Sequence, residues 1–305
     1  MKMKKFIAVL SMAAMIGTLA VGCGKSNEES KGEDAKAEAG SDWDSSMDIT
    51  IVSREDGSGT RGAFIELFGV EEKQGDEKVD MTTEEAQITN STSVMLTTVA
   101  GDEYAIGYVS LGSLDDSVKA VKIDGAEATA ENIKNDSYKV SRPFNIATKK
   151  GLDNEVAKDF INFIMSKEGQ EVVAENGYIG DDSAAAFSGS NPSGKVVVGG
   201  SSSISPVMEK LIEAYKAVNA NAEIELQTTD STTGMTSAID GSYDIGMASR
   251  ELKEEEVGQG LQATVIATDG IAVIVNNDNP TEELSSDQVK SIYTGETYTW
   301  DEVTE

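Results

Sequence analysis

Residues 49–68 read ITIVSREDGSGTRGAFIELF, and this stretch decides the fold of the chain. Ile49 to Ser53 is a short apolar run typical of a buried strand, and Arg61 to Phe68 has the apolar spacing of a helix. Residues 54–60, which lie between them, form a glycine-rich turn. A strand, such a turn and a helix in this order direct backbone N–H groups at the start of the helix, where they can bind an anion.

The same arrangement occurs twice more in the second half of the chain. Lys195 to Val198 predicts a strand that leads into the serines around Ser202, and Pro206 to Tyr215 predicts the helix behind them, with proline at its start. Ile224 to Gln227 predicts another strand, which runs into the turn around Ser231. A single Gly-Ser-Gly-Thr is more often an ordinary turn. Three hydroxyl-bearing turns before helices, one of them beside an arginine in a chain with few arginines, predict a site for a tetrahedral oxyanion.

The remaining pattern alternates in the same way, which predicts an α/β fold with parallel sheets. Further strands are expected at Ala105–Val109, Val118–Ile123, Tyr243–Met247 and Thr264–Ala267, and further helices at Val156–Met165 and Met235–Ile239. Residues 181–194 are rich in Ser, Asp and Gly, as linkers are, and separate two differently patterned halves.

Charge and composition exclude several classes of function. The net charge is -29, so the surface repels polyanions and nucleic-acid binding is not expected. The chain has no histidine, which excludes a Ser-His-Asp triad, a Cys-His pair and the common zinc sites. An enzyme that uses the GSGT turn for nucleotide or acyl transfer is an alternative, but the lysine of a P-loop is missing. We therefore expect no catalytic activity, no cofactor and no metal.

The first residues predict export. Residues 1–22 combine a basic start, an apolar run too short for a transmembrane helix, and small residues before Cys23, as signal peptides do. Residues 20–23, Ala-Val-Gly-Cys, resemble the bacterial lipobox, so Cys23 is expected to carry a lipid; a buried cysteine in an ordinary signal peptide is the alternative. Residues 23–46 have the composition of a solvated tether. The expected location is the outer face of the cytoplasmic membrane.

Taken together, these motifs resemble the phosphate-binding receptors of the ABC-type Pst importer in its Gram-positive form, which have the two-lobed type II periplasmic-binding-protein fold with a hinge. The resemblance rests on REDGSGTR at 54–61, AIGYVS at 105–110, SRPF at 141–144, GSSSISP at 200–206, STTG at 231–234, DIGMASRE at 244–251 and ATDGIA at 267–272. It implies a monomer that binds inorganic phosphate and delivers it to ABC permease subunits in the membrane. A phosphate-sensing or adhesive lipoprotein of the same fold is the alternative.

The order of the halves differs from that family, in which the Gly-Ser-Ser half comes first. The resemblance therefore implies a circularly permuted chain, with Trp43 and Trp300 marking the two sides of the opened connection. One lobe is then expected from residues 47–145 plus 268–305. The other is expected from residues 146–267, with 181–194 as the linker that joins the usual termini.

The resemblance also implies which residues bind phosphate. The expected contacts are Arg54, Ser58, Gly59 and Thr60 on one lobe and Ser202, Ser203, Ser231 and Ser249 on the other. Asp56 is expected to hold the Arg54 guanidinium, and Ser201 to support its turn. For Arg250 two interpretations are open, a ligand contact or a pair with Glu251. Arg142 is expected to be a brace at the crossover between the lobes and not a ligand.

Discrimination between phosphate and sulfate requires an acceptor for the phosphate proton. Gram-negative members of the family place an aspartate at the position that matches Ser249, so another carboxylate must act here. Asp269 follows a predicted strand at the crossover between the lobes, and we nominate it ahead of Asp230 and Glu251. An ordinary turn residue before Gly270 is the alternative.

Overall fold

The computed structural model describes residues 43–75 and 77–303. The predicted signal peptide, the lipidated Cys23 and the tether up to residue 42 lie outside the described residues. No helix among the described residues is long and apolar enough to cross a membrane.

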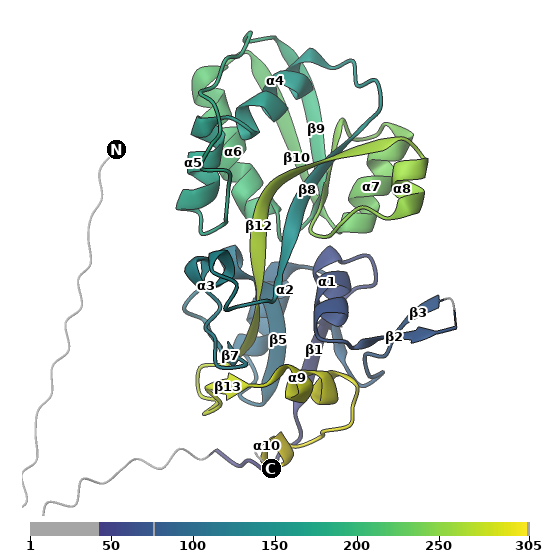
Figure 1. The fold of residues 1–305 in the computed structure, drawn as a ribbon, viewed down its shortest axis with the longest axis vertical. Coiled ribbons are helices and arrows are strands. Elements are labelled where there is room, and N and C mark those ends of the chain that lie inside the picture. Colours follow the sequence, from purple (N-terminus) through teal and green to yellow (C-terminus); the bar gives the residue numbers. More distant parts are fainter. Residues whose placement is uncertain (1–42, 76, 304–305) are drawn as a thin grey trace, which may run out of the picture. The chain divides into compact units, whose positions relative to one another are not determined.

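Within these residues the chain forms a mixed α/β fold around a nine-stranded sheet with the order β10-β9-β11-β8-β12-β5-β1-β4, in which β6 also pairs with β12 (Figure 1). The strands of this sheet are β1 Thr50–Arg54, β4 Gln87–Thr89, β5 Ala105–Ser110, β6 Val118–Ala120, β8 Ser141–Lys149, β9 Gly194–Ser201, β10 Ala222–Thr229, β11 Ile245–Ala248 and β12 Leu261–Asn276. Two short pairs lie outside it: β2 Glu71–Gln74 with β3 Glu77–Asp80, and β7 Lys122–Ile123 with β13 Glu283–Leu284.

The helices cover both faces of this sheet (Figure 1). They are α1 Gly59–Leu67, α2 Thr92–Ala100, α3 Ala130–Lys134, α4 Glu155–Ile164, α5 Lys167–Glu175, α6 Ser205–Val218, α7 Ser231–Asp240, α8 Glu254–Gly258, α9 Ser286–Tyr293 and α10 Trp300–Val303, with a 3-10 turn η1 at Leu111–Ser113. Of the predicted linker, residues 181–194, residues 181–193 carry neither helix nor strand, and Gly194 begins β9.

Strand direction differs from the prediction in the middle of the sheet. β10, β9 and β11 run parallel to one another, as do β5, β1 and β4. β8 and β12, however, run antiparallel to each other, and they are also antiparallel to β11 and β5, respectively. The predicted parallel sheets therefore hold for the outer strands but are wrong for β8 and β12. These two neighbouring strands are antiparallel because β8 carries the chain from one lobe into the other and β12 carries it back.

Two hydrophobic clusters define the lobes. One gathers residues from Ile49 to Val140 and again from Ile271 to Val303, and we call this part the Arg54 lobe. The other runs from Phe144 to Ala267, and we call it the Ser202 lobe. In Figure 1 the Ser202 lobe is the upper one, and the clusters change over within β8 and β12.

Aromatic side chains hold the two ends of the described residues together. The Trp43 ring stacks on Tyr104, with 4.7 Å between centroids, and meets the edge of Trp300 at 6.0 Å. The Trp300 Nε1–H donates to the Tyr104 carbonyl oxygen at 3.1 Å. Trp43 therefore packs against the fold, although the predicted tether extends to residue 46.

Candidate functional site

The first candidate turn joins β1 to α1. β1 ends at Arg54, and α1 begins at Gly59, two residues before the predicted start at Arg61. The helix starts earlier because Ser58 caps it: the Ser58 Oγ accepts a hydrogen bond from the Arg61 backbone N–H at 3.3 Å. Gly59 and Thr60 are buried in the first turn. The backbone N–H groups of Gly59 and Thr60, which have no partner within the helix, are thus available at the carboxyl end of β1.

The Ser202 lobe presents serines at the ends of its parallel strands. β9 ends at Ser201, Ser249 follows β11, and Ser231 starts α7 with Asp230 as its N-cap. The Ser201 Oγ–H donates to the Ser249 Oγ at 2.9 Å, and the Ser249 backbone N–H donates to the Ser231 Oγ at 3.1 Å. All three serines are buried. Because carboxyl ends of parallel strands meet at one edge of a sheet, the three turns form one hydroxyl-lined surface.

Hydroxyl groups and a guanidinium from the two lobes meet directly. The Thr60 Oγ1 lies 2.8 Å from the Ser203 Oγ, and the Arg54 Nη2–H donates to the Ser202 Oγ at 3.1 Å. All four side chains are buried. The structure therefore brings these four predicted residues together at the contact between the lobes.

Glycines permit the close approach of the lobes. The Thr232 backbone N–H donates to the Gly57 carbonyl oxygen at 3.2 Å. A Cβ atom at Gly59 would overlap the Ser231 Oγ and would lie 2.8 Å from the Ser249 Oγ. A side chain at position 59 is therefore incompatible with this arrangement of the lobes.

The carboxylate that holds Arg54 is Glu55 and not Asp56. Glu55 accepts two hydrogen bonds from the Arg54 guanidinium, from Nε and Nη2, both at 2.8 Å. The Asp56 side chain is 97% exposed and pairs instead with Arg61 at 2.9 Å. The sequence-based assignment of Asp56 as the support of Arg54 thus differs from the structure, because the turn points Asp56 outward toward the helix.

Arg250 is held by a carboxylate that the sequence did not indicate. Its guanidinium donates to both Glu256 oxygens, at 2.7 and 2.9 Å, and to the Glu251 carbonyl oxygen at 2.9 Å. A weaker contact of 3.4 Å reaches the Thr232 Oγ1. The Arg250 guanidinium therefore pairs with the side chain of Glu256, the third residue of α8, and not with the side chain of Glu251.

Arg142 and Asp269 form a buried pair on the crossing strands. The Arg142 Nη2–H donates to the Asp269 Oδ2 at 3.0 Å, and the Ser110 hydroxyl donates to the Asp269 Oδ1 at 2.9 Å. Burial raises the pKa of Asp269 to about 6 and lowers the pKa of Arg142. Arg142 thus links β8 to β12 where the chain crosses between the lobes, and the Asp269 carboxylate accepts hydrogen bonds from Arg142 and Ser110.

Thr92 belongs to this group, although sequence reasoning missed it. It starts α2, and its Oγ1 lies 3.3 Å from the Ser202 Oγ and 3.2 Å from the Ser203 Oγ. The Thr92 backbone N–H also donates to the Ser202 Oγ at 3.3 Å. The available signal was the run Asn-Ser-Thr-Ser at residues 90–93, which precedes an apolar helix as the other hydroxyl-bearing turns do.

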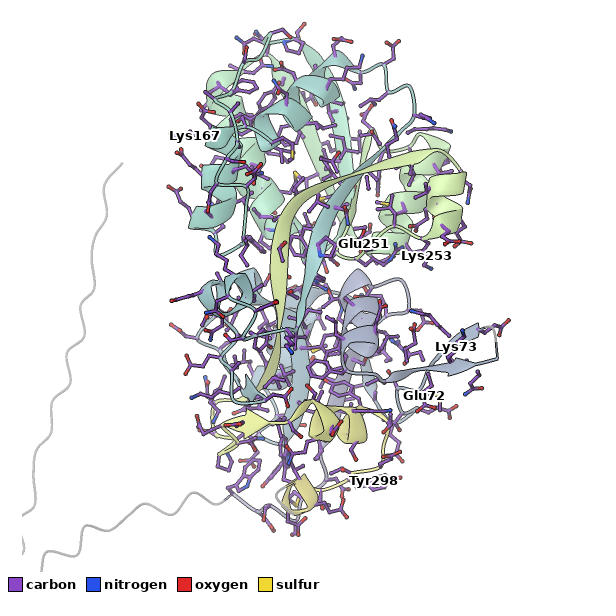
Figure 2. All side chains as sticks on the ribbon, viewed as in Figure 1. Glu72, Lys73, Lys167, Glu251, Lys253 and Tyr298 are labelled. Atoms are coloured by element: carbon purple, nitrogen blue, oxygen red, sulfur yellow. The ribbon has the colours of Figure 1, made fainter. Side chains whose placement is uncertain are left out.

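A large cavity opens beside these contacts. It has a volume of about 860 Å³ and is lined by residues of both lobes, among them Gly62 and Ala63 of α1, Arg142 of β8 and residues 250–254. In Figure 2 the labelled Glu251 and Lys253 lie where the Ser202 lobe faces the Arg54 lobe. This cavity lies between the two lobes, and its lining includes none of Arg54, Thr60, Ser202 and Ser203.

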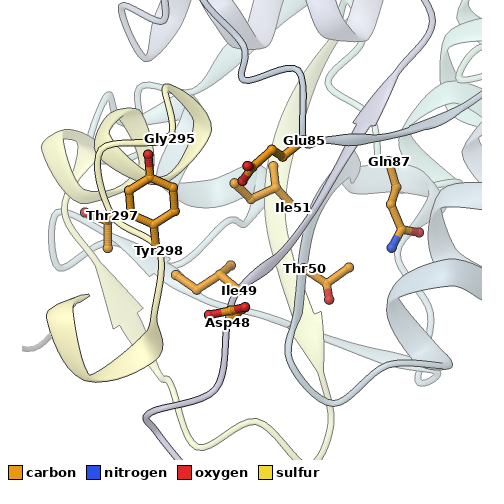
Figure 3. Close-up of a pocket in the computed structure, with 9 residues that line it drawn as sticks. All are labelled: Asp48, Ile49, Thr50, Ile51, Glu85, Gln87, Gly295, Thr297 and Tyr298. Atoms are coloured by element: carbon orange, nitrogen blue, oxygen red, sulfur yellow. The ribbon is translucent and has the colours of Figure 1, made fainter.

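A second cavity, of about 440 Å³, lies at the amino end of β1 (Figure 3). Its described lining includes the carboxylates of Asp48 and Glu85 and no lysine or arginine. It is therefore unsuited to an anion. Among the described residues no cluster of His, Cys, Asp or Glu could hold a metal ion.

Comparisons with known proteins found a matching domain model, similar sequences and a similar solved structure. The model of the PBP superfamily domain matches residues 9–168 and 185–305. The chain is 55% identical to phosphate-binding protein PstS 2 of Streptococcus agalactiae over 99% of both chains, and 42% identical to phosphate-binding protein PstS 2 of Streptococcus pneumoniae over 99% of this chain and 100% of that one. A crystal structure of a phosphate-binding protein of a phosphate ABC transporter from Streptococcus pneumoniae superposes with a TM-score of 0.67 at 44% identity, covering 84% of this chain and 99% of that chain.

The PBP superfamily domain model matches most of the chain, including residues of both lobes, so the chain belongs to this superfamily. Within that superfamily, the similarity over nearly the whole length shows the narrower group. The chain belongs to the PstS family of phosphate-binding proteins.

The order of the two halves is not peculiar to this chain. The alignments with the streptococcal relatives cover nearly all of both chains, so these relatives share the order. The circular permutation expected from the sequence stays a prediction.

Proposed function

We propose that this chain binds inorganic phosphate outside the cytoplasm and delivers it to an ABC-type permease in the membrane, as a receptor and not as an enzyme. One observation carries the proposal: at the contact between the lobes, Arg54 meets Ser202 and Thr60 meets Ser203, all four buried. A fixed cation, hydroxyl donors and free helix N-termini are the groups that hold a tetrahedral oxyanion. The names of the streptococcal relatives support phosphate as that oxyanion.

We further propose that the phosphate-binding residues come from both lobes. They are Arg54, Ser58, Gly59, Thr60 and Thr92 from the Arg54 lobe and Ser202, Ser203, Ser231 and Ser249 from the Ser202 lobe, with Glu55 and Ser201 in support. Hydrogen bonds to a charged partner contribute about 1.5 to 3 kcal/mol each. Micromolar affinity corresponds to about 8 kcal/mol. A few of these hydrogen bonds therefore suffice for micromolar affinity for phosphate.

Selectivity for phosphate over sulfate is proposed to depend on Asp269. Its carboxylate is buried on the crossing strand β12, and burial raises its pKa to about 6, so it gains a proton more readily than an exposed aspartate. A buried acceptor of this kind favours an anion that carries a proton and disfavours one that does not.

The remaining parts of the proposal concern the whole chain. We propose that the lobes close around phosphate by bending at β8 and β12. The sequence predicts the lobe boundaries at residues 145/146 and 267/268, whereas the hydrophobic clusters change over between Val140 and Phe144 and between Ala267 and Ile271. The mature protein is proposed to be a monomer that is held at the outer face of the cytoplasmic membrane by a lipid on Cys23. Mass spectrometry of the protein from cells tests the lipid, and an unmodified Cys23 contradicts it.

Isothermal titration calorimetry of the purified chain with inorganic phosphate tests the function. We expect one phosphate per chain, weaker binding of sulfate, and a melting temperature that rises with phosphate concentration. A titration without heat, together with a melting temperature that does not respond to phosphate, would refute the proposal.

A further inference from the structure

The Arg142 guanidinium has donors that no protein group uses. Its side chain is 2% exposed, and its Nη2–H pairs with Asp269 at 3.0 Å. The Nε and Nη1 atoms are buried without a hydrogen-bond partner. Arginine cannot lose its charge in a protein, so these N–H groups are removed from water without a hydrogen-bond acceptor. The guanidinium carbon lies 5.4 Å from the centroid of the Phe144 ring, a cation–π contact that stabilises the charge but accepts no hydrogen bond from Nε or Nη1. Because buried donors in proteins are nearly always hydrogen-bonded, these N–H groups indicate a bound ligand or another group that supplies an acceptor.

The sheet register shows on which face Arg142 lies. Arg142 pairs with Asp269 across β8 and β12, so the two side chains share a face. Ile271 lies two residues after Asp269 on β12 and so shares its face. Ser110 of β5 pairs with Ile271 and therefore lies on the same face. Tyr108, two residues before Ser110, shares this face too, and its ring stacks on Phe64 of α1 at 4.0 Å. Arg142 therefore lies on the face of the sheet that α1 covers. Gly59 and Thr60, two of the predicted phosphate contacts, are the first residues of that helix.

Arg54 and Arg142 are both buried cations, and each is held by one carboxylate. Arg54 is held by Glu55, and Arg142 is held by Asp269. The positive charge of Arg54 also acts on Arg142 and, after burial, contributes to lowering the pKa of Arg142. An anion between two such cations removes their mutual repulsion, and the described residues provide no carboxylate partner for the Nε and Nη1 atoms of Arg142.

We propose that Arg142 is a second cationic ligand of the bound phosphate, donating through Nε and Nη1 while Asp269 holds its Nη2. This deepens the proposed function and rests on it. Arg142 then has two roles, as the brace between β8 and β12 and as a sensor that couples the crossing strands to the anion. Asp269 acts in part as the positioning residue of Arg142.

A comparison of two variants isolates Arg142. Asp269→Asn removes the carboxylate, and Arg142→Gln combined with Asp269→Asn removes both charges while leaving two amides that can bond to each other. We expect the double variant to bind phosphate at least tenfold more weakly than Asp269→Asn in calorimetry. Thermal unfolding without phosphate reports on folding separately. The matched control is Arg250→Gln combined with Glu256→Gln, an arginine pair whose Nη1 and Nη2 are used by protein groups, and it should bind phosphate like the wild type.

Equal phosphate affinities of Asp269→Asn and the double variant would overturn the proposal and leave Arg142 as a brace only. If the double variant does not fold, Arg142→Lys replaces it, because lysine keeps a charge for Asp269 but lacks the planar fork. We expect Arg142→Lys to lose about fivefold or more in phosphate affinity, and wild-type affinity there overturns the proposal. A wild type that does not bind phosphate refutes the proposed function itself, which is a different result.

Discussion

Gly59→Ala should weaken phosphate binding while leaving the unliganded protein at least as stable as before. The backbone at Gly59 does not adopt a positive φ, so alanine fits the local conformation. The new methyl group would overlap the Ser231 Oγ and lie 2.8 Å from the Ser249 Oγ, both in the other lobe. The clash thus exists only when the lobes are together, and an open form avoids it.

The expected magnitude follows from that overlap. Inserting one carbon into a packed contact costs about 1 to 3 kcal/mol. Since about 1.4 kcal/mol corresponds to a factor of ten, this amounts to roughly a 5- to 150-fold loss of affinity. Alanine is a better helix former than glycine by up to about 1 kcal/mol. That gain applies to open and closed forms alike, so it raises stability without restoring affinity.

Calorimetry with phosphate and thermal unfolding without phosphate measure the two effects. Gly62→Ala is the matched control, because Gly62 lies on the same helix and a Cβ there meets no atom within 4 Å. It should bind phosphate like the wild type and share any gain in stability. If Gly59→Ala binds phosphate as tightly as Gly62→Ala, phosphate is not held in the closed arrangement of the lobes.

Further predictions concern single side chains of the site. Arg54→Ala should weaken phosphate binding at least tenfold in calorimetry, since it removes a buried cation; unchanged affinity would place the anion elsewhere. Thr92→Val keeps the shape but removes a hydroxyl worth about 1 kcal/mol, so roughly a fivefold loss is expected, and no loss would exclude Thr92 from the site. Asp269→Asn should lower the ratio of phosphate to sulfate affinity, and an unchanged ratio removes Asp269 from selectivity. Because burial raises the pKa of Asp269 from 3.8 to about 6, the folded state binds more protons between these pH values. The free energy of unfolding attributable to Asp269 therefore falls as the pH rises from about 4 to 6. Urea denaturation should show a smaller fall in Asp269→Asn than in the wild type, and identical pH profiles would contradict the shift.

The sequence predicted the parts of the site that are built from local signals. The turn after β1 is recognisable because Gly57 and Gly59 interrupt an apolar strand and helix, and the same reasoning found the turns at Ser202 and Ser231. Thr92 was not predicted as part of the site, because the strand before it, β4, has only three residues, Gln87–Thr89. This strand lacks the apolar run by which a strand is recognised in a sequence.

The directions in which side chains point, and the residues with which they pair, could not be predicted from the sequence. Glu55 and Asp56 are adjacent carboxylates, and composition does not tell which one faces the guanidinium. The pairing of Arg142 with Asp269 joins residues 127 positions apart and depends on the antiparallel register of β8 and β12, which the local pattern did not predict.

The two crossing strands also determine the order in which the protein can assemble. The core of the Ser202 lobe lies in one continuous segment, from Phe144 to Ala267, so it can be complete before the chain end is synthesised. The Arg54 lobe cannot, because β5 and β6 both pair with the second half of β12. Folding on the ribosome should therefore proceed from the middle of the chain outward, with β5 and β6 lacking their β12 partner until that strand is synthesised.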